Sequence, residues 1–87
     1  MTRFPIRIVL EPQPEGGYTV TSPDVPDLVT EAETVDEAIA FAQEVAGLLY
    51  ETYRDHGIEM PEALRAGPIA DAEVDVKLLP VPRAWAA

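Results

Sequence analysis

Residues 34–57 hold the strongest structural pattern in the sequence, an amphipathic helix with a signal at each end. Thr34-Val35-Asp36-Glu37 matches a capping box, in which the threonine hydroxyl and the glutamate carboxylate satisfy backbone N–H groups at a helix start. Gly57 is a typical C-cap residue. At about 100° per residue, one broad face gathers Ala38, Phe41, Ala42, Val45, Leu48, Leu49, Tyr53 and His56. A helix of this kind needs an apolar surface to lie on.

The segments around this helix supply that surface as short strands. Residues 3–11 alternate, with Phe4, Ile6, Ile8 and Leu10 on one face, and Pro5 indicates a strand end or a sheet edge. The breaker-rich segment 12–17 followed by residues 18–21 predicts a β-hairpin. Residues 28–31 predict a third strand, and the alternation over 72–79 predicts a fourth, with Ala72, Val74, Val76 and Leu78 on one face.

The order of these elements predicts an α+β fold of the type β-β-β-α-β. We expect an antiparallel three-stranded meander and a fourth strand, with one long amphipathic helix packed on the apolar face of the sheet. A short helical turn is expected near residues 61–64. The 87 residues fit a single domain, 1–87, that ends in a proline-rich tail over 80–87.

Composition excludes several classes of protein. The chain has no cysteine, so we expect no disulfide, no thiolate metal site and a reducing compartment. No apolar run approaches the roughly 20 residues that span a bilayer, and Arg7 and Glu11 interrupt any signal-peptide core. The sequence therefore predicts a soluble cytoplasmic protein that does not enter a membrane.

The negative charge is concentrated in one part of the chain. Sixteen acids and six bases give a formal net charge of −10, and no Lys or Arg lies between Arg7 and Arg54. Ten acids fall in that stretch and account for the whole imbalance. Such a field repels nucleic-acid phosphate and attracts basic surfaces. We expect no direct nucleic-acid binding, and the charge fits either a basic protein partner or plain solubility.

The sequence holds few residues of the types that commonly act in catalysis. His56 is the only histidine and Ser22 the only serine, and neither lies in a catalytic motif. An enzymatic alternative is a carboxylate metal site formed by Asp24, Asp27 and Glu31, although the spacing of these residues matches no calcium loop. Gly16-Gly17 lacks the lysine and the following helix of a phosphate cradle. We therefore expect no enzyme, no cofactor and no resident metal.

Apolar side chains at the flank of the helix raise the question of self-association. Ile39, Ala46 and Tyr50 lie there, and together with Trp85 they give more apolar surface than one thin domain needs. They fit either a homo-oligomer, a dimer being the commonest case, or an ordinary core margin.

Several sequence blocks also occur in an order that resembles the HicB family of antitoxins. They are an alternating first strand, then Gly16-Gly17-Tyr18-Thr19-Val20, then Pro23-Asp24-Val25-Pro26-Asp27-Leu28, then Glu33-Thr34-Val35-Asp36-Glu37-Ala38. The resemblance covers roughly residues 4–61 and the later strand. It implies a partial ribonuclease H-like fold and a small basic HicA-type toxin that cleaves mRNA and that the antitoxin occludes.

Carried over to this sequence, the resemblance places toxin contacts near Tyr18, Asp24, Asp27, Leu28, Glu31 and Glu33. Many members of the family carry a C-terminal DNA-binding unit, whereas this sequence ends at Ala87, soon after the fourth strand. We therefore expect no operator binding by this chain alone. The leading hypothesis is a non-enzymatic antitoxin, and the alternative is an orphan, self-associating domain of the same fold that binds another protein or a small ligand.

Overall fold

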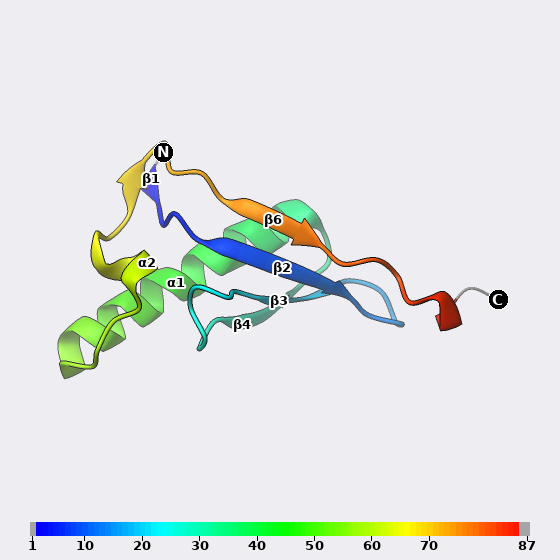
Figure 1. The fold of residues 1–87 in the computed structure, drawn as a ribbon, viewed down its shortest axis with the longest axis horizontal. Helices are drawn as coiled ribbons and strands as arrows, with labels where there is room; N and C mark the ends of the chain where they lie inside the picture. Colours follow the sequence, from blue (N-terminus) through cyan, green and yellow to red (C-terminus); the bar gives the residue numbers. More distant parts are fainter. Residues whose placement is uncertain (1, 86–87) are drawn as a thin grey trace.

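A four-stranded sheet lies against one long helix in the computed structural model, which describes residues 2–85 (Figure 1). The strand order is β4-β3-β2-β6. The strands are β2 (Arg7–Pro12), β3 (Tyr18–Thr21), β4 (Val29–Ala32) and β6 (Asp75–Leu78). The first three form the predicted antiparallel meander, and β6 runs parallel to β2. The predicted α+β fold is therefore confirmed.

The predicted strand over residues 3–11 is divided in two. β1 (Thr2–Arg3) ends before Pro5 and pairs with β5 (Ile69–Ala70), a short strand that the sequence analysis missed. The break follows from Pro5, which lacks a backbone N–H for the ladder. A short helix α2 (Glu62–Arg65) and a 3-10 turn η1 (Arg83–Trp85) complete the described chain. Residues 86–87 of the proline-rich tail lie outside the described residues.

Helix α1 (Val35–His56) begins and ends where its caps predict. The Thr34 hydroxyl accepts a hydrogen bond from the Glu37 backbone N–H, at 3.1 Å. The Glu37 carboxylate in turn accepts one from the backbone N–H of Glu33, at 3.2 Å. At the other end Gly57 adopts the left-handed conformation, with φ of 62°. Both ends are therefore fixed by local chemistry.

The core lies between α1 and the inner face of the sheet. Phe4, Ile6, Ile8 and Leu10 are buried as predicted. From α1 the buried residues are Ala38, Ala42, Ala46 and Tyr53. The small alanine side chains let the helix axis lie close to the sheet.

This alanine stripe corrects the predicted helix face. Leu48 and His56 were expected on the buried side, but Leu48 is 65% exposed and His56 is also exposed. The periodicity of the apolar residues defines a broad face of the helix. The positions of Ala38, Ala42 and Ala46 determine which part of that face contacts the sheet. The larger side chains at the margin are left partly outside the core.

Strand β6 is also less buried than predicted. It covers only four residues of the predicted 72–79, and Val76 and Leu78 remain 36% and 53% exposed. The register pairs them with Ile8 and Leu10, so that they lie on the same side of the sheet as α1. They are exposed because α1 packs over β2, β3 and β4.

Candidate protein-binding surface

Two adjoining cavities lie where the β2–β3 turn, β4 and α1 meet. Their volumes are about 350 Å³ and 590 Å³, and both are lined by Glu31 and Phe41. We call the two cavities together the acidic groove. It is lined by Gln13, Glu15, Gly16, Gly17, Tyr18, Thr30, Glu31, Ala32, Glu33, Glu37, Phe41, Glu44, Val45, Gly47, Leu48 and Glu51.

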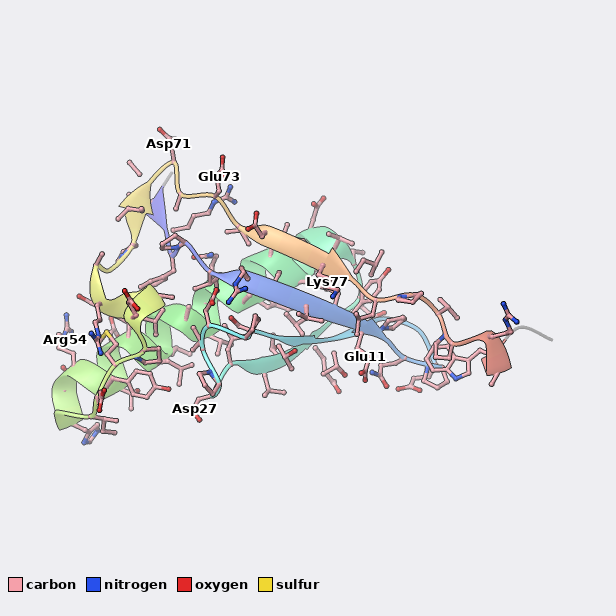
Figure 2. The ribbon with its side chains drawn as sticks, viewed as in Figure 1. Glu11, Asp27, Arg54, Asp71, Glu73 and Lys77 are labelled. Carbon is pink, nitrogen blue, oxygen red and sulfur yellow. The ribbon has the colours of Figure 1, made fainter. Side chains whose placement is uncertain are left out.

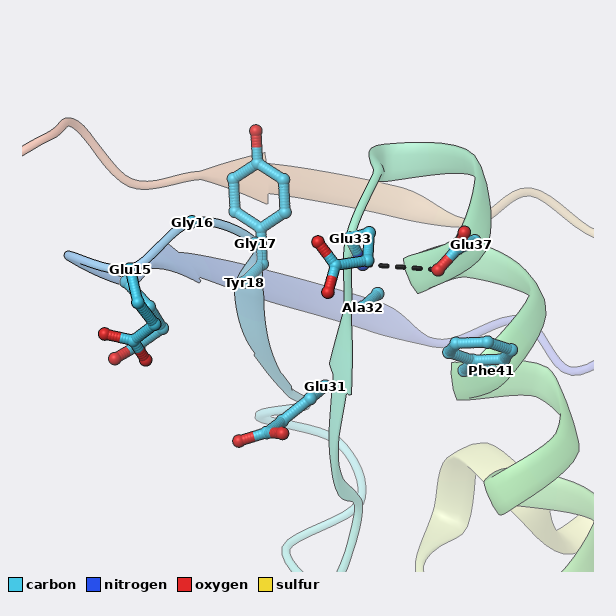
Figure 3. A pocket seen from close by; sticks show the side chains of 10 residues that line it. Glu15, Gly16, Gly17, Tyr18, Glu31, Ala32, Glu33, Glu37 and Phe41 are labelled. Carbon is cyan, nitrogen blue, oxygen red and sulfur yellow. Dashed lines mark hydrogen bonds between the residues drawn. The ribbon is translucent and has the colours of Figure 1, made fainter.

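The groove has one sign of charge. Its lining includes six glutamates and neither lysine nor arginine. Figure 3 shows the end nearest the turn, where Glu15, Tyr18 and Glu33 project around the opening and Glu37 reaches back to Glu33. Carboxylates of one sign along a groove focus a negative potential outward. A cationic surface would therefore be drawn to it.

The groove also has an apolar component. Phe41 and Val45 are half-buried against the core, and Leu48, one turn further along α1, is largely exposed. Exposed apolar side chains that are rimmed by polar groups are typical of protein-binding surfaces. The composition of this groove suits a partner with both apolar and basic groups.

The six residues predicted to contact a partner are divided by the structure. Tyr18, Glu31 and Glu33 line the acidic groove. Asp24, Asp27 and Leu28 lie in the loop between β3 and β4, where each has an intramolecular contact. The prediction of these contacts stays a prediction, but the two groups do not form one continuous cluster.

Asp24 holds its loop against β2. Its carboxylate accepts a hydrogen bond from the Arg7 backbone N–H at 2.8 Å and forms an ion pair with the Arg7 guanidinium at 2.6 Å. The Arg7 side chain, mainly through its hydrogen bonds, lowers the pKa of Asp24 below its usual value. The same pair raises the pKa of Arg7. The negative charge of Asp24 is therefore largely compensated by Arg7 of the same chain.

The next acid in the loop is also engaged. Asp27 accepts a hydrogen bond from the Tyr53 hydroxyl of α1 (Figure 2 labels Asp27 at the loop). Burial, together with this carboxylate, raises the pKa of Tyr53 to about 12. Leu28 is 0% exposed and belongs to the core. Leu28 therefore presents no surface to a partner in this conformation.

The alternative of a carboxylate metal site does not agree with this geometry. Asp24 is paired with Arg7 and Asp27 with Tyr53, whereas Glu31 lines the groove. Within residues 2–85, no three His, Cys, Asp or Glu side chains are gathered in a way that could hold a metal ion. The Asp24, Asp27 and Glu31 site considered from the sequence does not form.

The residues predicted to support self-association do not form one patch. Ala46 is 0% exposed and faces the core, where an alanine lets α1 approach the sheet. Tyr50 packs on Phe4, with ring centroids 5.6 Å apart. Ile39 is half-buried beside the core, and Trp85 lies at the far end of the molecule, in η1 (Figure 1). An interface built from all four is not supported.

The part of the groove that α1 contributes was not predicted from the sequence. Phe41, Glu44, Leu48 and Glu51 belong to it. A signal was present, because Ala38, Ala42 and Ala46 form a narrower stripe at i, i+4 and i+8 than the whole apolar face. The larger side chains beside that stripe were candidates for a second surface.

The fold and the groove together define a small α+β domain with an acidic and partly apolar surface of the kind that contacts other proteins. A family model described as "HicB_like antitoxin of bacterial toxin-antitoxin system" matches residues 4–75. This match covers most of the 87 residues. The chain belongs to the HicB-like antitoxin family.

Individual relatives agree with this assignment. "Antitoxin HicB 1" of Photorhabdus laumondii is 36% identical over 76 residues, covering 87% of this chain and 46% of the relative. "Antitoxin HicB" of Escherichia coli K12 is 34% identical over 74 residues, covering 68% of this chain and 52% of the relative. The chain thus spans about half the length of these curated relatives. In the described part of the chain, neither helix has the length and apolarity to cross a membrane.

Proposed function

We propose that this chain is a non-enzymatic antitoxin that binds a small basic HicA-type toxin and occludes its RNA-cleaving site. The observation that carries the proposal is the acidic groove, an apolar surface rimmed by six glutamates with no lysine or arginine in its lining. Membership of the HicB-like antitoxin family supports the same proposal.

The charge of the groove suits the task of blocking a ribonuclease. A protein that holds RNA needs a basic surface for the phosphates. The glutamates of the groove offer carboxylates to that same surface and thereby compete with RNA for it. Charge steers the encounter, and the apolar side chains Phe41, Val45 and Leu48 supply surface whose burial lowers the free energy of the complex.

The first test is capture of the partner from the native cell. The tagged chain is used at low salt, and proteins that co-purify are identified by mass spectrometry. We expect one small basic protein at near-equal amount, released as salt is raised. This protein should cleave RNA, and the chain should inhibit that cleavage at one-to-one stoichiometry. Recovery of the chain alone, or of a partner whose RNA cleavage it leaves unaffected, would contradict the proposal.

A charge-reversal pair locates the contact. Glu33→Lys with Glu44→Lys changes one carboxylate in each cavity. Glu59→Lys with Glu62→Lys makes the same change of net charge in exposed residues outside the groove. We expect the groove variant to lose at least about a hundredfold in toxin affinity, since buried or close charge pairs each contribute one to several kcal/mol. The control variant should lose about threefold or less. Equal losses would show that only the total charge matters.

A further inference from the structure

Among residues 2–85, no hydrogen bond engages the backbone groups on the outer edge of β6. β6 lies at one end of the strand order β4-β3-β2-β6. The Leu79 backbone N–H donates to the Leu10 carbonyl at 2.9 Å, which directs the backbone groups of Leu79 toward β2. Consecutive residues of a strand direct these groups to opposite sides of the strand. Val74, Val76 and Leu78 therefore present their N–H and C=O groups outward, away from β2.

The side chains of this edge are balanced in charge, unlike those of the groove. Lys77, the only lysine of the chain, lies two residues from Asp75 (Figure 2 labels Lys77). Among the residues that the structure describes, the ion pairs involve neither of them. Val76 and Leu78, between and after them, are exposed on the α1 side. A second acidic copy of the chain would meet less repulsion here than at the groove.

One antiparallel register makes this edge complementary to itself. A two-fold axis at Val76 sets Val76 opposite Val76 of the second copy, and Val74 opposite Leu78 of the second copy. All of these residues present backbone groups outward, so that they form the hydrogen-bonded pairs of the ladder. The same axis sets Asp75 opposite Lys77 of the second copy, twice. Apolar residues thus meet apolar residues, and opposite charges meet.

The neighbouring registers are worse. An axis at Val74 would set Glu73 opposite Asp75 of the second copy, and like charges that are directly opposed destabilise a sheet. An axis at Leu78 would set Pro80 opposite Val76 of the second copy, and proline has no N–H for the ladder. A lysine on an edge strand discourages pairing with unrelated strands. A partner strand with an acid opposite Lys77, as Asp75 of a second copy would be, offsets that penalty.

We infer that the β6 edge is a homodimer interface, in which two copies pair antiparallel about Val76 to form a continuous eight-stranded sheet, twice the four strands of one copy. The two-fold axis stands perpendicular to the sheet, so that both copies of α1 lie on the same face. The side chains of Val76 and Leu78, which α1 leaves exposed in one copy, then contact the cross-strand side chains of the other copy on the same face of the sheet. This interface involves none of the groove residues and does not rest on the proposed function.

A charge swap tests the pairing. Sedimentation velocity over a concentration series gives the dimer affinity of the wild type, Asp75→Lys, Lys77→Asp and the double variant. Each single change opposes like charges at two symmetric positions and should weaken the dimer by about tenfold or more. The double swap restores opposite charges and should return the affinity to within about threefold of the wild type. Thermal unfolding of each variant verifies that the protomer is folded.

A single introduced cysteine tests the register. Residues opposite each other in hydrogen-bonded pairs have Cα atoms about 5.5 Å apart, within the range of a disulfide. Since the chain has no cysteine of its own, Val76→Cys should cross-link to a dimer on mild oxidation. Val29→Cys, a more exposed valine on the opposite edge strand, is the control and should cross-link much more slowly. A wild type that stays monomeric, a double swap that fails to restore the dimer, or equal cross-linking of both cysteines would overturn the inference.

Discussion

At the scale of single residues, Asp24 shows how a partly exposed acid in a loop can have a structural role. Its carboxylate joins the β3–β4 loop to β2 through both the backbone N–H and the side chain of Arg7. The Ser22 hydroxyl accepts a hydrogen bond from the Asp24 backbone N–H at 3.1 Å, which shapes the same loop. Asp24 and Arg7 therefore fix where the loop leaves the sheet.

The lowered pKa of Asp24 predicts a specific sensitivity to acid. A carboxyl whose pKa is lower in the folded chain stabilises the fold above its unfolded pKa, about 3.9. This contribution is lost as the pH falls through the lower folded value. Urea unfolding at a series of pH values between about 5 and 2 should show that Asp24→Asn loses less stability on acidification than the wild type. Glu59→Gln, an exposed acid with only a long ion pair, should follow the wild type. Equal acid dependence of Asp24→Asn and the wild type would refute this role.

At the scale of elements, the β2–β3 hairpin depends on two glycines with different surroundings. Gly16 and Gly17 both have positive φ, at 103° and 75°. A Cβ atom on Gly17 would lie 2.9 Å from the Ala32 carbonyl oxygen of β4, whereas a Cβ on Gly16 would meet nothing within 4 Å. Gly17 therefore permits both the turn and the close approach of β3 and β4.

This difference predicts unequal costs for two otherwise identical substitutions. Gly16→Ala should lower the free energy of unfolding by about 1–2 kcal/mol, the usual cost of a side chain at positive φ. Gly17→Ala should cost at least about 1 kcal/mol more, because backbone atoms must also move. Urea unfolding of the two variants measures the difference. Equal destabilisation would mean that β4 shifts freely, and that the close contact is without consequence.

Elements with local signals were predicted well from the sequence, and those that depend on distant contacts were not. Thr34, Glu37 and Gly57 mark the ends of α1 through interactions with adjacent residues, so the helix was found nearly to the residue. The exposure of Leu48 was missed because it depends on how closely the alanine stripe lies on the sheet. The β1–β5 pair joins residues far apart in the sequence, and two-residue strands carry no periodicity.

The same distinction applies to the candidate site. Tyr18, Glu31 and Glu33 were selected from the sequence and line the groove. The contribution of α1 to the groove could not be predicted in the same way, because it depends on which side of the helix faces the sheet. The intramolecular partners of Asp24 and Asp27, Arg7 and Tyr53, come from other elements and have no sequence signal.

At the scale of the whole molecule, the two proposed surfaces lie on opposite edges of the sheet. The acidic groove lies between β4 and α1, and the dimer edge is β6, at the other end of the strand order (Figure 1). One surface is strongly acidic, and the other carries Asp75 and Lys77, which would pair between copies in the proposed dimer. A dimer formed through β6 would therefore leave both grooves open to the proposed toxin.

This separation predicts that the two activities are independent. Effects at sites that are well separated and share no contacts are normally additive. Glu33→Lys with Glu44→Lys should weaken toxin binding by at least about a hundredfold and leave the dimer affinity within about threefold of the wild type. Lys77→Asp should weaken the dimer and leave the toxin affinity of each protomer unchanged. Light scattering of the complex should give two chains and two toxins for the wild type, and one of each for Lys77→Asp at low concentration. A joint loss of both activities in either variant would show that the groove and the β6 edge are coupled, because toxin binding would then require the dimer.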